Sequence, residues 1–287
     1  MKILFLGVFN DQSTNVSQAQ ALRRAGCEVI EYEYREWAHG IGEDKRDQDI
    51  VTSVQYAKSD VVLFSKCDRV HCRVVDECRQ AGAKTVLWYM DPMSNFDDEL
   101  KEKIKRVDVT FAALQEPFRA ASEISPGNVF FLHEGFDVLI DRPVDVDECR
   151  DVTFIGELYG HRAGYHREVE FEVVSGVYGS DHSRVVCESR INLNFTQGGT
   201  SDRTYKVLAA GGFLLTQPWP GMDGDFEVGK HLDVFRSVEE LREKIAFWLE
   251  NENLRLKVAR AGNRVVQRFV IDAWAKTIMK AGRGVES

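Results

Sequence analysis

Four consecutive residues, from Ser201 to Thr204, offer a hydroxyl, a carboxylate, a guanidinium and a second hydroxyl. They come directly before a short apolar segment, 205–210, that predicts a helix ended by a pair of glycines. A helix N-terminus presents free N–H groups and a positive field, and an Arg beside it binds phosphate through two parallel hydrogen bonds. The pattern therefore predicts an anion site in which Arg203 is exposed and packs against little.

A longer match surrounds this cluster. The segment from Ser201 to Phe247 resembles the C-terminal signature of the CgeB/YkvP-like glycosyltransferases, a branch of the GT-B superfamily. The matching positions are Arg203, Thr204, Tyr205, 209–216, Phe226, Gly229, Lys230 and 239–241. The resemblance implies an α/β fold of two Rossmann-like domains, with the C-terminal helix crossing back to the N-domain. It also implies that Ser201, Asp202, Arg203, Thr204, Tyr205 and Lys206 bind the donor, a nucleotide-diphosphate sugar.

Lys206 departs from the family pattern. The family usually carries a Glu there, which is expected to hold the ribose hydroxyls of the nucleotide. A carboxylate accepts hydrogen bonds from hydroxyls, whereas an ammonium only donates. We expect Lys206 to contribute charge to the donor instead; a degenerate, non-catalytic site is the alternative.

Two further segments resemble donor-side elements of the family. In the run 154–162, Gly156 would let the backbone approach the ligand and Arg162 would supply charge to the diphosphate. Tyr178 and Gly179 resemble the element near the nucleotide base. The competing interpretations are a glycine turn with a solvated Arg, and a strand that ends in a turn.

Candidate catalytic residues lie in the N-terminal half. Asp91 follows an apolar run and resembles the family's W-x-x-D segment, at a place where open α/β sheets carry ligand groups. His133 and Glu134 precede a Gly-Phe-Asp sequence that resembles the family's entry to the second domain, and either could transfer a proton. An Asp-Pro turn and a surface His-Glu pair are the alternatives.

Two polar residues follow the first apolar run. Asn10 and Asp11 are candidate acceptor ligands, because the loop that carries them comes after a predicted strand. The same residues are also common turn formers.

The chain has 287 residues, enough for two domains of ordinary size. Its net charge of −9 argues against broad adhesion to nucleic acid or anionic membranes, although it does not exclude a local basic surface. The apolar start is too short for a signal peptide, and no segment has the length of a transmembrane span. Its six cysteines show no C-x-x-C spacing, so we expect reduced thiols and a cytoplasmic protein.

Short apolar runs alternate with helical patterns along both halves, which predicts two mostly parallel sheets. Among the expected elements are a helix over 51–58 and a strand over 173–178. The expected division is an acceptor-side domain over 1–141, a linker over 142–151, a nucleotide-sugar domain over 152–270, and a helix over 271–287 that packs back on the first domain.

The sequence and its family resemblance therefore predict a glycosyltransferase that needs no cofactor and no metal. The resemblance also suggests that it retains the anomeric configuration. Asp145–Asp147 has a metal-binding form but lies in the expected linker, and His71, Cys72 and Cys78 lack zinc spacing. The acceptor stays open among a glycan, a protein, a small molecule and a modified DNA base, and so does the oligomeric state. The alternatives are a GT-B-type sugar-nucleotide epimerase and a non-catalytic sugar-nucleotide-binding protein.

Overall fold

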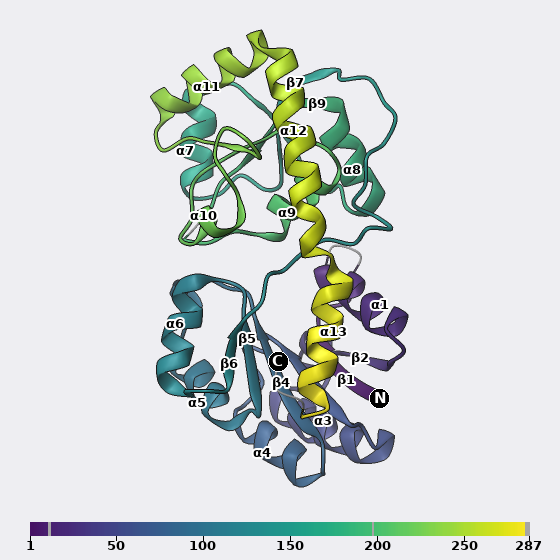
Figure 1. Cartoon of the computed structure of the whole chain (residues 1–287). Coiled ribbons are helices and arrows are strands. Elements are labelled where there is room, and N and C mark those ends of the chain that lie inside the picture. Colours follow the sequence, from purple (N-terminus) through teal and green to yellow (C-terminus); the bar gives the residue numbers. More distant parts are fainter. Residues whose placement is uncertain (11–12, 197, 285–287) are drawn as a thin grey trace. The chain divides into compact units, whose positions relative to one another are not determined.

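The computed structural model describes residues 1–10, 13–196 and 198–284 (Figure 1). The chain divides into two compact units. The first comprises Met1–Glu134 together with the C-terminal segment from Ile271, and the second comprises Gly135–Val270. Each unit is built around its own parallel sheet.

The first unit contains a six-stranded sheet in the order β2-β1-β3-β4-β5-β6, and all of its pairings are parallel. The strands are β1 Lys2–Gly7, β2 Glu28–Glu33, β3 Val61–Ser65, β4 Lys84–Tyr89, β5 Val109–Ala112 and β6 Val129–Phe131. The order reverses between β1 and β3, which is where open sheets of this kind form a crevice beyond their carboxyl ends.

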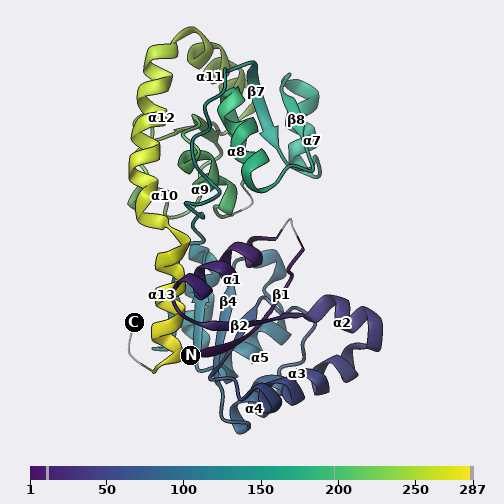
Figure 2. The ribbon, with the colours of Figure 1, turned by 90° about the vertical axis from the view of Figure 1, so that its right-hand side faces the viewer.

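Helices cover both faces of this sheet (Figure 2). Ile3 and Phe5 of β1 pack with α1 (Thr14–Arg24) and α13 (Ile271–Gly282), whereas Leu4 and Leu6 face the core formed with the helices on the other side. Those are α3 (Glu43–Ala57), α4 (Arg73–Gln80), α5 (Asp98–Arg106) and α6 (Gln115–Ile124), with α2 (Tyr34–Ile41) beside α3.

The C-terminal helix α13 packs within the first unit, as the resemblance implied. It lies against α1 and β4. Trp274 of α13 meets Trp88 of β4 edge to face, with ring centroids 5.7 Å apart, and Asp272 pairs with Arg24 of α1. These contacts bury the apolar face of α13 against the sheet.

The second unit contains a five-stranded parallel sheet in the order β11-β10-β9-β7-β8. Its strands are β7 Arg150–Ile155, β8 Glu172–Val174, β9 Ser189–Asn194, β10 Leu214–Thr216 and β11 Asp233–Val234. The helices are α7 His161–Glu168, α8 Gly179–Glu188, α9 Asp202–Ala209, α10 Met222–Asp225, α11 Val238–Glu250 and α12 Glu252–Val266. The fold class, two Rossmann-like α/β domains, is confirmed.

Several expected elements differ in extent. The helix expected over 51–58 is the end of α3, which begins at Glu43, and the strand expected over 173–178 is β8, which ends at Val174. Helix α9 begins at Asp202 rather than Tyr205, with Ser201 as its N-cap residue. The first turns of α3 and α9 were not predicted because they consist of polar residues, and only the later turns carry the apolar face.

Candidate functional site

The guanidinium of Arg203 lies at the carboxyl end of the second sheet, in the first turn of α9. Its Nη1 donates to Asn194 Oδ1 of β9 at 2.9 Å, and its Cζ lies 5.0 Å from the centre of the Phe154 ring of β7. Burial, more than any other cause, lowers the pKa of Arg203. The expectation of an exposed Arg203 that packs against little is therefore wrong.

Gly156 lies directly against this guanidinium. The residue follows β7 with φ +144°, and a Cβ there would stand 2.8 Å from Arg203 Nη2 and 3.2 Å from the Phe154 ring. The loop after β7 therefore has its present path because residue 156 has no side chain.

Arg162 of α7 adds a second positive charge. Its Cζ lies 5.5 Å from the Phe154 ring centre and 4.6 Å from that of Tyr159. Its charge contributes, after burial, to the lowered pKa of Arg203. Within the described residues neither guanidinium forms an ion pair with a carboxylate. Two arginines thus converge on one ring beside a helix N-terminus, an arrangement suited to an anion.

Asn194 connects the parts of this site, and the sequence analysis missed it. Its Nδ2 donates to Thr204 Oγ1 at 3.2 Å while its Oδ1 accepts from Arg203. The sequence pattern could have indicated this residue. Asn192 and Asn194 alternate with apolar residues along β9, and this period of two places both amides on one face of the sheet.

Not all predicted donor residues present their side chains outward. Tyr205 is fully buried and packs against Phe269, with ring centroids 5.2 Å apart. The Thr204 side chain is also fully buried. A ligand could reach these two residues only through their backbone, whereas Ser201 and Asp202 are half-buried.

Lys206 is paired with an acid one turn earlier on α9. Its Nζ lies 2.7 Å from Asp202 Oδ2. The charge of Lys206 acts on two buried titratable groups. Burial raises the pKa of Asp141 to about 6, and the charge of Lys206 opposes this rise. Burial lowers the pKa of His182 to about 3, and the charge of Lys206 lowers it further. The position that departs from the family pattern thus lies in a cluster of charged residues.

Tyr178 and Gly179 stand at the start of α8. Tyr178 is the N-cap residue and is 40% exposed. Gly179 has φ +57°, and a Cβ there would lie 3.9 Å from Ile140. Because the Tyr178 ring is exposed at a helix start, it is accessible for stacking on a base, as its predicted role near the nucleotide base requires.

In the first unit, Asp91 lies at the carboxyl end of β4. Its Oδ1 accepts from Lys66 Nζ at 2.6 Å and its Oδ2 from Asn95 at 3.2 Å. Lys66 and Cys67 follow β3 with φ of 58° and 57°, and the buried ammonium of Lys103 donates to Cys67 O at 2.8 Å. Lys103 thus holds the turn that brings Lys66 to Asp91.

The other candidates of the first unit are not brought to Asp91 by any described contact. Asn10 is exposed, and its carbonyl accepts from Ser13 N at 2.9 Å; Asp11 lies outside the described residues. His133 and Glu134 are half-buried, and the His133 ring meets Phe131 edge to face with centroids 4.9 Å apart.

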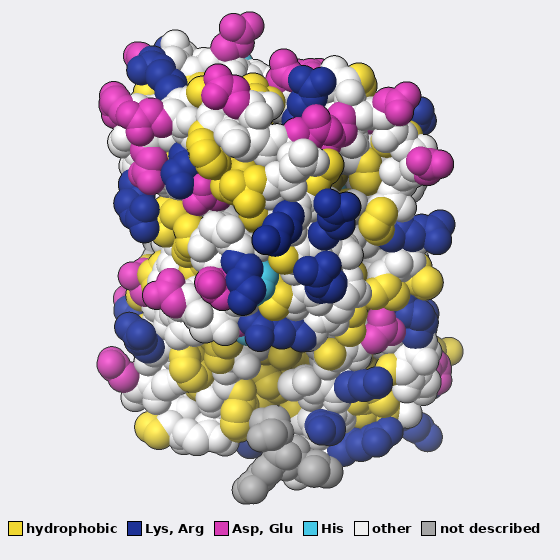
Figure 3. Space-filling model, turned by 45° about the horizontal axis from the view of Figure 1, so that its top comes forward, with side chains coloured by type: hydrophobic (Ala, Val, Ile, Leu, Met, Phe, Trp, Pro, Cys, Tyr) yellow, Lys and Arg dark blue, Asp and Glu magenta, His cyan; other side chains and the backbone are white. Residues whose placement is uncertain are grey.

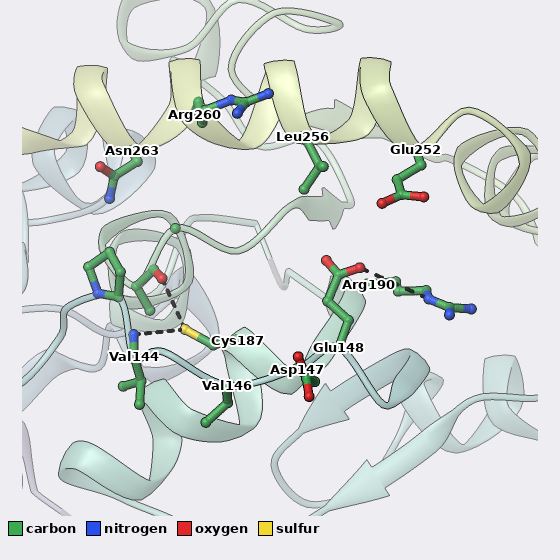
Figure 4. Close-up of a pocket in the computed structure, with 13 residues that line it drawn as sticks. Val144, Val146, Asp147, Glu148, Cys187, Arg190, Glu252, Leu256, Arg260 and Asn263 are labelled. Carbon is green, nitrogen blue, oxygen red and sulfur yellow. Dashed lines mark hydrogen bonds and ion pairs between the residues drawn. The ribbon is translucent and has the colours of Figure 1, made fainter.

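A cavity of about 680 Å³ in the second unit lies away from all of these residues (Figure 4). The expected linker forms one wall, α12 the opposite wall and Cys187 part of the floor, where Cys187 Sγ accepts from Val144 N and donates to Ala210 O, both at 3.3 Å. None of the predicted site residues lines it.

His71, Cys72 and Glu99 each offer one ligand atom, and these atoms lie within 4.8 Å of one another. Cys78 is not part of this group. His71 Nδ1 already accepts from Arg73 N at 3.1 Å, and Glu99 accepts from Cys72 N at 2.5 Å, so both are used by the backbone at the start of α4. The cluster stabilises a helix start as it stands.

With this geometry described, comparison with solved structures identifies the fold as that of the GT-B glycosyltransferases. HepE from Anabaena in complex with UDP-glucose superposes with a TM-score of 0.76 at 11% identity, over 99% of this chain and 100% of that one. Sucrose-phosphate synthase from Thermosynechococcus elongatus gives 0.74 at 10% identity, over 99% and 98%. T4 phage BGT in complex with UDP-glucose gives 0.62 at 10% identity, over 98% and 99%.

Comparison of the sequence with protein-family models gives a match over part of the chain. Residues 142–280 match the model of a family described as glycosyl transferase-like. Curated proteins gave no match to the sequence. Among the helices of the described residues, none has the length and hydropathy needed to cross a membrane.

Proposed function

We propose that this protein is a glycosyltransferase that moves a sugar from a nucleotide-diphosphate donor to an acceptor. The observation that carries the proposal is the pair of arginines, Arg203 and Arg162, on Phe154 beside the α9 N-terminus. The family match over 142–280 contains both of them, and structural neighbours of the same fold hold UDP-glucose.

In this proposal the donor diphosphate lies at Arg203 and Arg162. Their positive charges offset the charge that develops on the leaving diphosphate, as preorganised cations do in other sites. The positive end of the α9 dipole and the backbone of Gly156 complete the site, and Tyr178 stacks on the base. No metal ion is needed for this task, and no cofactor beyond the co-substrate.

The acceptor is proposed to bind the first unit, at the strand ends that carry Asp91 and Lys66. Asn10 and Asp11, which follow β1 in the sequence, are further candidates for this binding. Asp91, His133 and Glu134 are the candidates for proton transfer. A carboxylate paired with an ammonium offers both an acceptor and a donor to hydroxyl groups. Retention of the anomeric configuration follows from the family resemblance alone and is part of the proposal.

A screen of nucleotide sugars by thermal shift tests the donor site, and donor turnover measured with and without candidate acceptors tests the reaction. Transfer that requires an acceptor supports the transferase. Conversion of the donor sugar without an acceptor would instead identify an epimerase. Tight binding without any turnover would favour a non-catalytic protein, the alternative that Lys206 raises.

Metal independence is tested by chelation. We expect EDTA to leave turnover unchanged, because two guanidinium groups already supply the positive charge at the diphosphate. Cys72→Ser provides the control, since it removes one member of the His71, Cys72 and Glu99 group. Complete loss of turnover in EDTA, restored by manganese or magnesium, would contradict the prediction.

A further inference from the structure

A stripe of cations runs along the exposed side of α12. It consists of Lys257, Arg260 and Arg264 on the helix and Arg268 in the short 3-10 turn that follows. At about 100° per residue these positions fall within an arc of about 80°, and at 1.5 Å per residue they span about 16 Å. We call these residues the α12 stripe.

The α12 stripe differs from the charged surfaces of α5 and α8. On those helices cations pair with an acid three or four residues away, as in Lys101–Asp98, Lys105–Glu102 and Arg184–Glu188. Between Asn253 and Phe269 the sequence has no acid at all. Arg268 alone has a carboxylate near it, Asp225 at 3.4 Å; within the described part of the chain the other three form no ion pair.

Folding does not explain this arrangement. Arg260, Arg264 and Arg268 succeed one another at intervals of four residues, and like charges at this spacing destabilise a helix. The helix dipole favours cations in the last turn only, which leaves Lys257 and Arg260 without that compensation. A chain with net charge −9 thus keeps a line of mutually repelling cations on one helix.

The loop beside the stripe carries both signs of charge, since Lys230 forms an ion pair with Glu227 at 2.8 Å. Gly262 packs against the carbonyl of His231, which places the loop of Lys230 and His231 beside α12. Burial lowers the pKa of His231, and the charges of Lys230, Arg268 and Arg264 lower it further, against Glu227. Figure 3 shows Lys and Arg side chains gathered on one face, with Asp and Glu side chains beside them.

We propose that the α12 stripe binds the phosphate backbone of a nucleic acid. Successive cations of the stripe lie about 6 Å apart along the helix axis. Phosphates of one DNA strand follow one another at about 3.4 Å along the duplex axis, so every second phosphate lies at a similar spacing. A membrane surface is disfavoured, because a surface-binding helix needs an apolar face to insert. The apolar residues of α12, such as Val258, Ala259 and Val266, are buried in the core of the second unit. The contact does not depend on the transferase reaction.

The test is fluorescence anisotropy of the full chain with a labelled DNA duplex of about 20 base pairs, which exceeds the length of the stripe. With four phosphate contacts, a threefold rise in salt should weaken binding about fifty-fold. Replacing two cations, Arg260→Gln with Arg264→Gln, should reduce this loss to about sevenfold. Gln keeps a good helix propensity, so the fold is retained, which circular dichroism verifies.

The matched control is Lys101→Gln with Lys105→Gln on α5, which removes the same charge from paired cations of the first unit. It should leave both affinity and salt dependence as in the natural protein. Absence of DNA binding at low salt, or an equal effect of the two double variants, would overturn the proposal. So would binding to vesicles of anionic lipid without binding to DNA. None of these outcomes bears on donor binding, which the nucleotide-sugar screen measures separately.

Discussion

The strand ends of the two sheets compensate their charges in different ways. In the first unit two cations near the strand ends each have a carboxylate: Lys66 lies 2.6 Å from Asp91, and Arg35 lies 2.9 Å from Asp68, which also accepts from Tyr34. In the second unit Arg203 and Arg162 rest on an aromatic ring, and a neutral amide accepts from Arg203. The charges of Lys66 and Arg35 are thus paired, whereas those of Arg203 and Arg162 are left for an anion to offset.

This difference supports the proposal that the carboxyl ends of the two sheets, the first and second edge, bind different ligands. Two guanidinium groups close together repel each other and are costly to bury, so the second edge gains most from a doubly charged ligand such as a diphosphate. An ion pair that is already formed gains little from a further charge but can exchange hydrogen bonds with hydroxyl groups. The comparison therefore agrees with a donor on the second unit and a neutral, hydroxyl-bearing acceptor on the first.

The largest effect is expected from removing charge at the second edge. Arg203→Met keeps an unbranched side chain on Phe154 but loses the guanidinium, and should cost about 1.5–3 kcal/mol of nucleotide-sugar affinity, roughly a ten- to hundredfold change. Calorimetry with the best nucleotide sugar measures it. Lys66→Met is the control at the first edge and should leave this affinity unchanged. Equal losses in both variants would abolish the distinction between the edges.

A second prediction distinguishes two effects of replacing a glycine: strain in the backbone and displacement of the Arg203 guanidinium. Gly156 and Gly160 both have positive φ, but only at Gly156 would a Cβ meet Arg203; at Gly160 nothing lies within 4 Å. Alanine at either position should lower the free energy of unfolding by about 1–3 kcal/mol. Only Gly156→Ala should also weaken donor binding. If Gly160→Ala weakens it equally, the close approach to Arg203 does not shape the site.

A third prediction concerns pH. The raised pKa of Asp141, about 6 in the folded state, makes folding less favourable as pH rises from about 4 to 6. The lowered pKa of His182, about 3, has the opposite sign: its stabilising effect is lost as pH falls below the ordinary His value. In the natural protein the two trends oppose each other.

Asp141→Asn should therefore leave only the effect of His182, which is a loss of stability as the pH falls. Its stability should fall more steeply on acidification than that of the natural protein, by on the order of 2 kcal/mol between neutral pH and pH about 4. Urea denaturation at several pH values measures this. An Asp141→Asn variant with the pH profile of the natural protein would show that Asp141 titrates normally.

The smallest effect is expected at Lys206. Its pair with Asp202 is partly exposed, so Lys206→Ala should weaken donor binding by only about 1 kcal/mol. Lys206→Glu restores the residue that the family usually carries, but it places a carboxylate beside Asp202 and should not improve binding. A clear gain in donor affinity or turnover for Lys206→Glu would instead support a degenerate site.

Local periodicity was sufficient to predict most strands and helices, because strands such as β1, β3 and β4 are nearly continuous apolar runs buried on both faces. Elements whose apolar residues are few or interrupted were missed, such as α7, in which no residue is buried, and the first turns of α3. Such helices are stabilised by what they pack against rather than by a pattern of their own.

The candidate site was predictable where one segment of chain carries it, and not where several segments meet. The sequence alone determined the alternation of apolar runs and helices that builds both sheets, and it predicted an anion site at 201–204. The contact that requires glycine at 156 came from the structure. Only the tertiary structure showed that Arg203 is half-buried, that Asn194 holds it, and that Lys66 neutralises Asp91. These contacts join residues that are 9 and 25 positions apart in the chain. Charge compensation depends on distance in space, and sequence spacing reports it only within a single helix or turn.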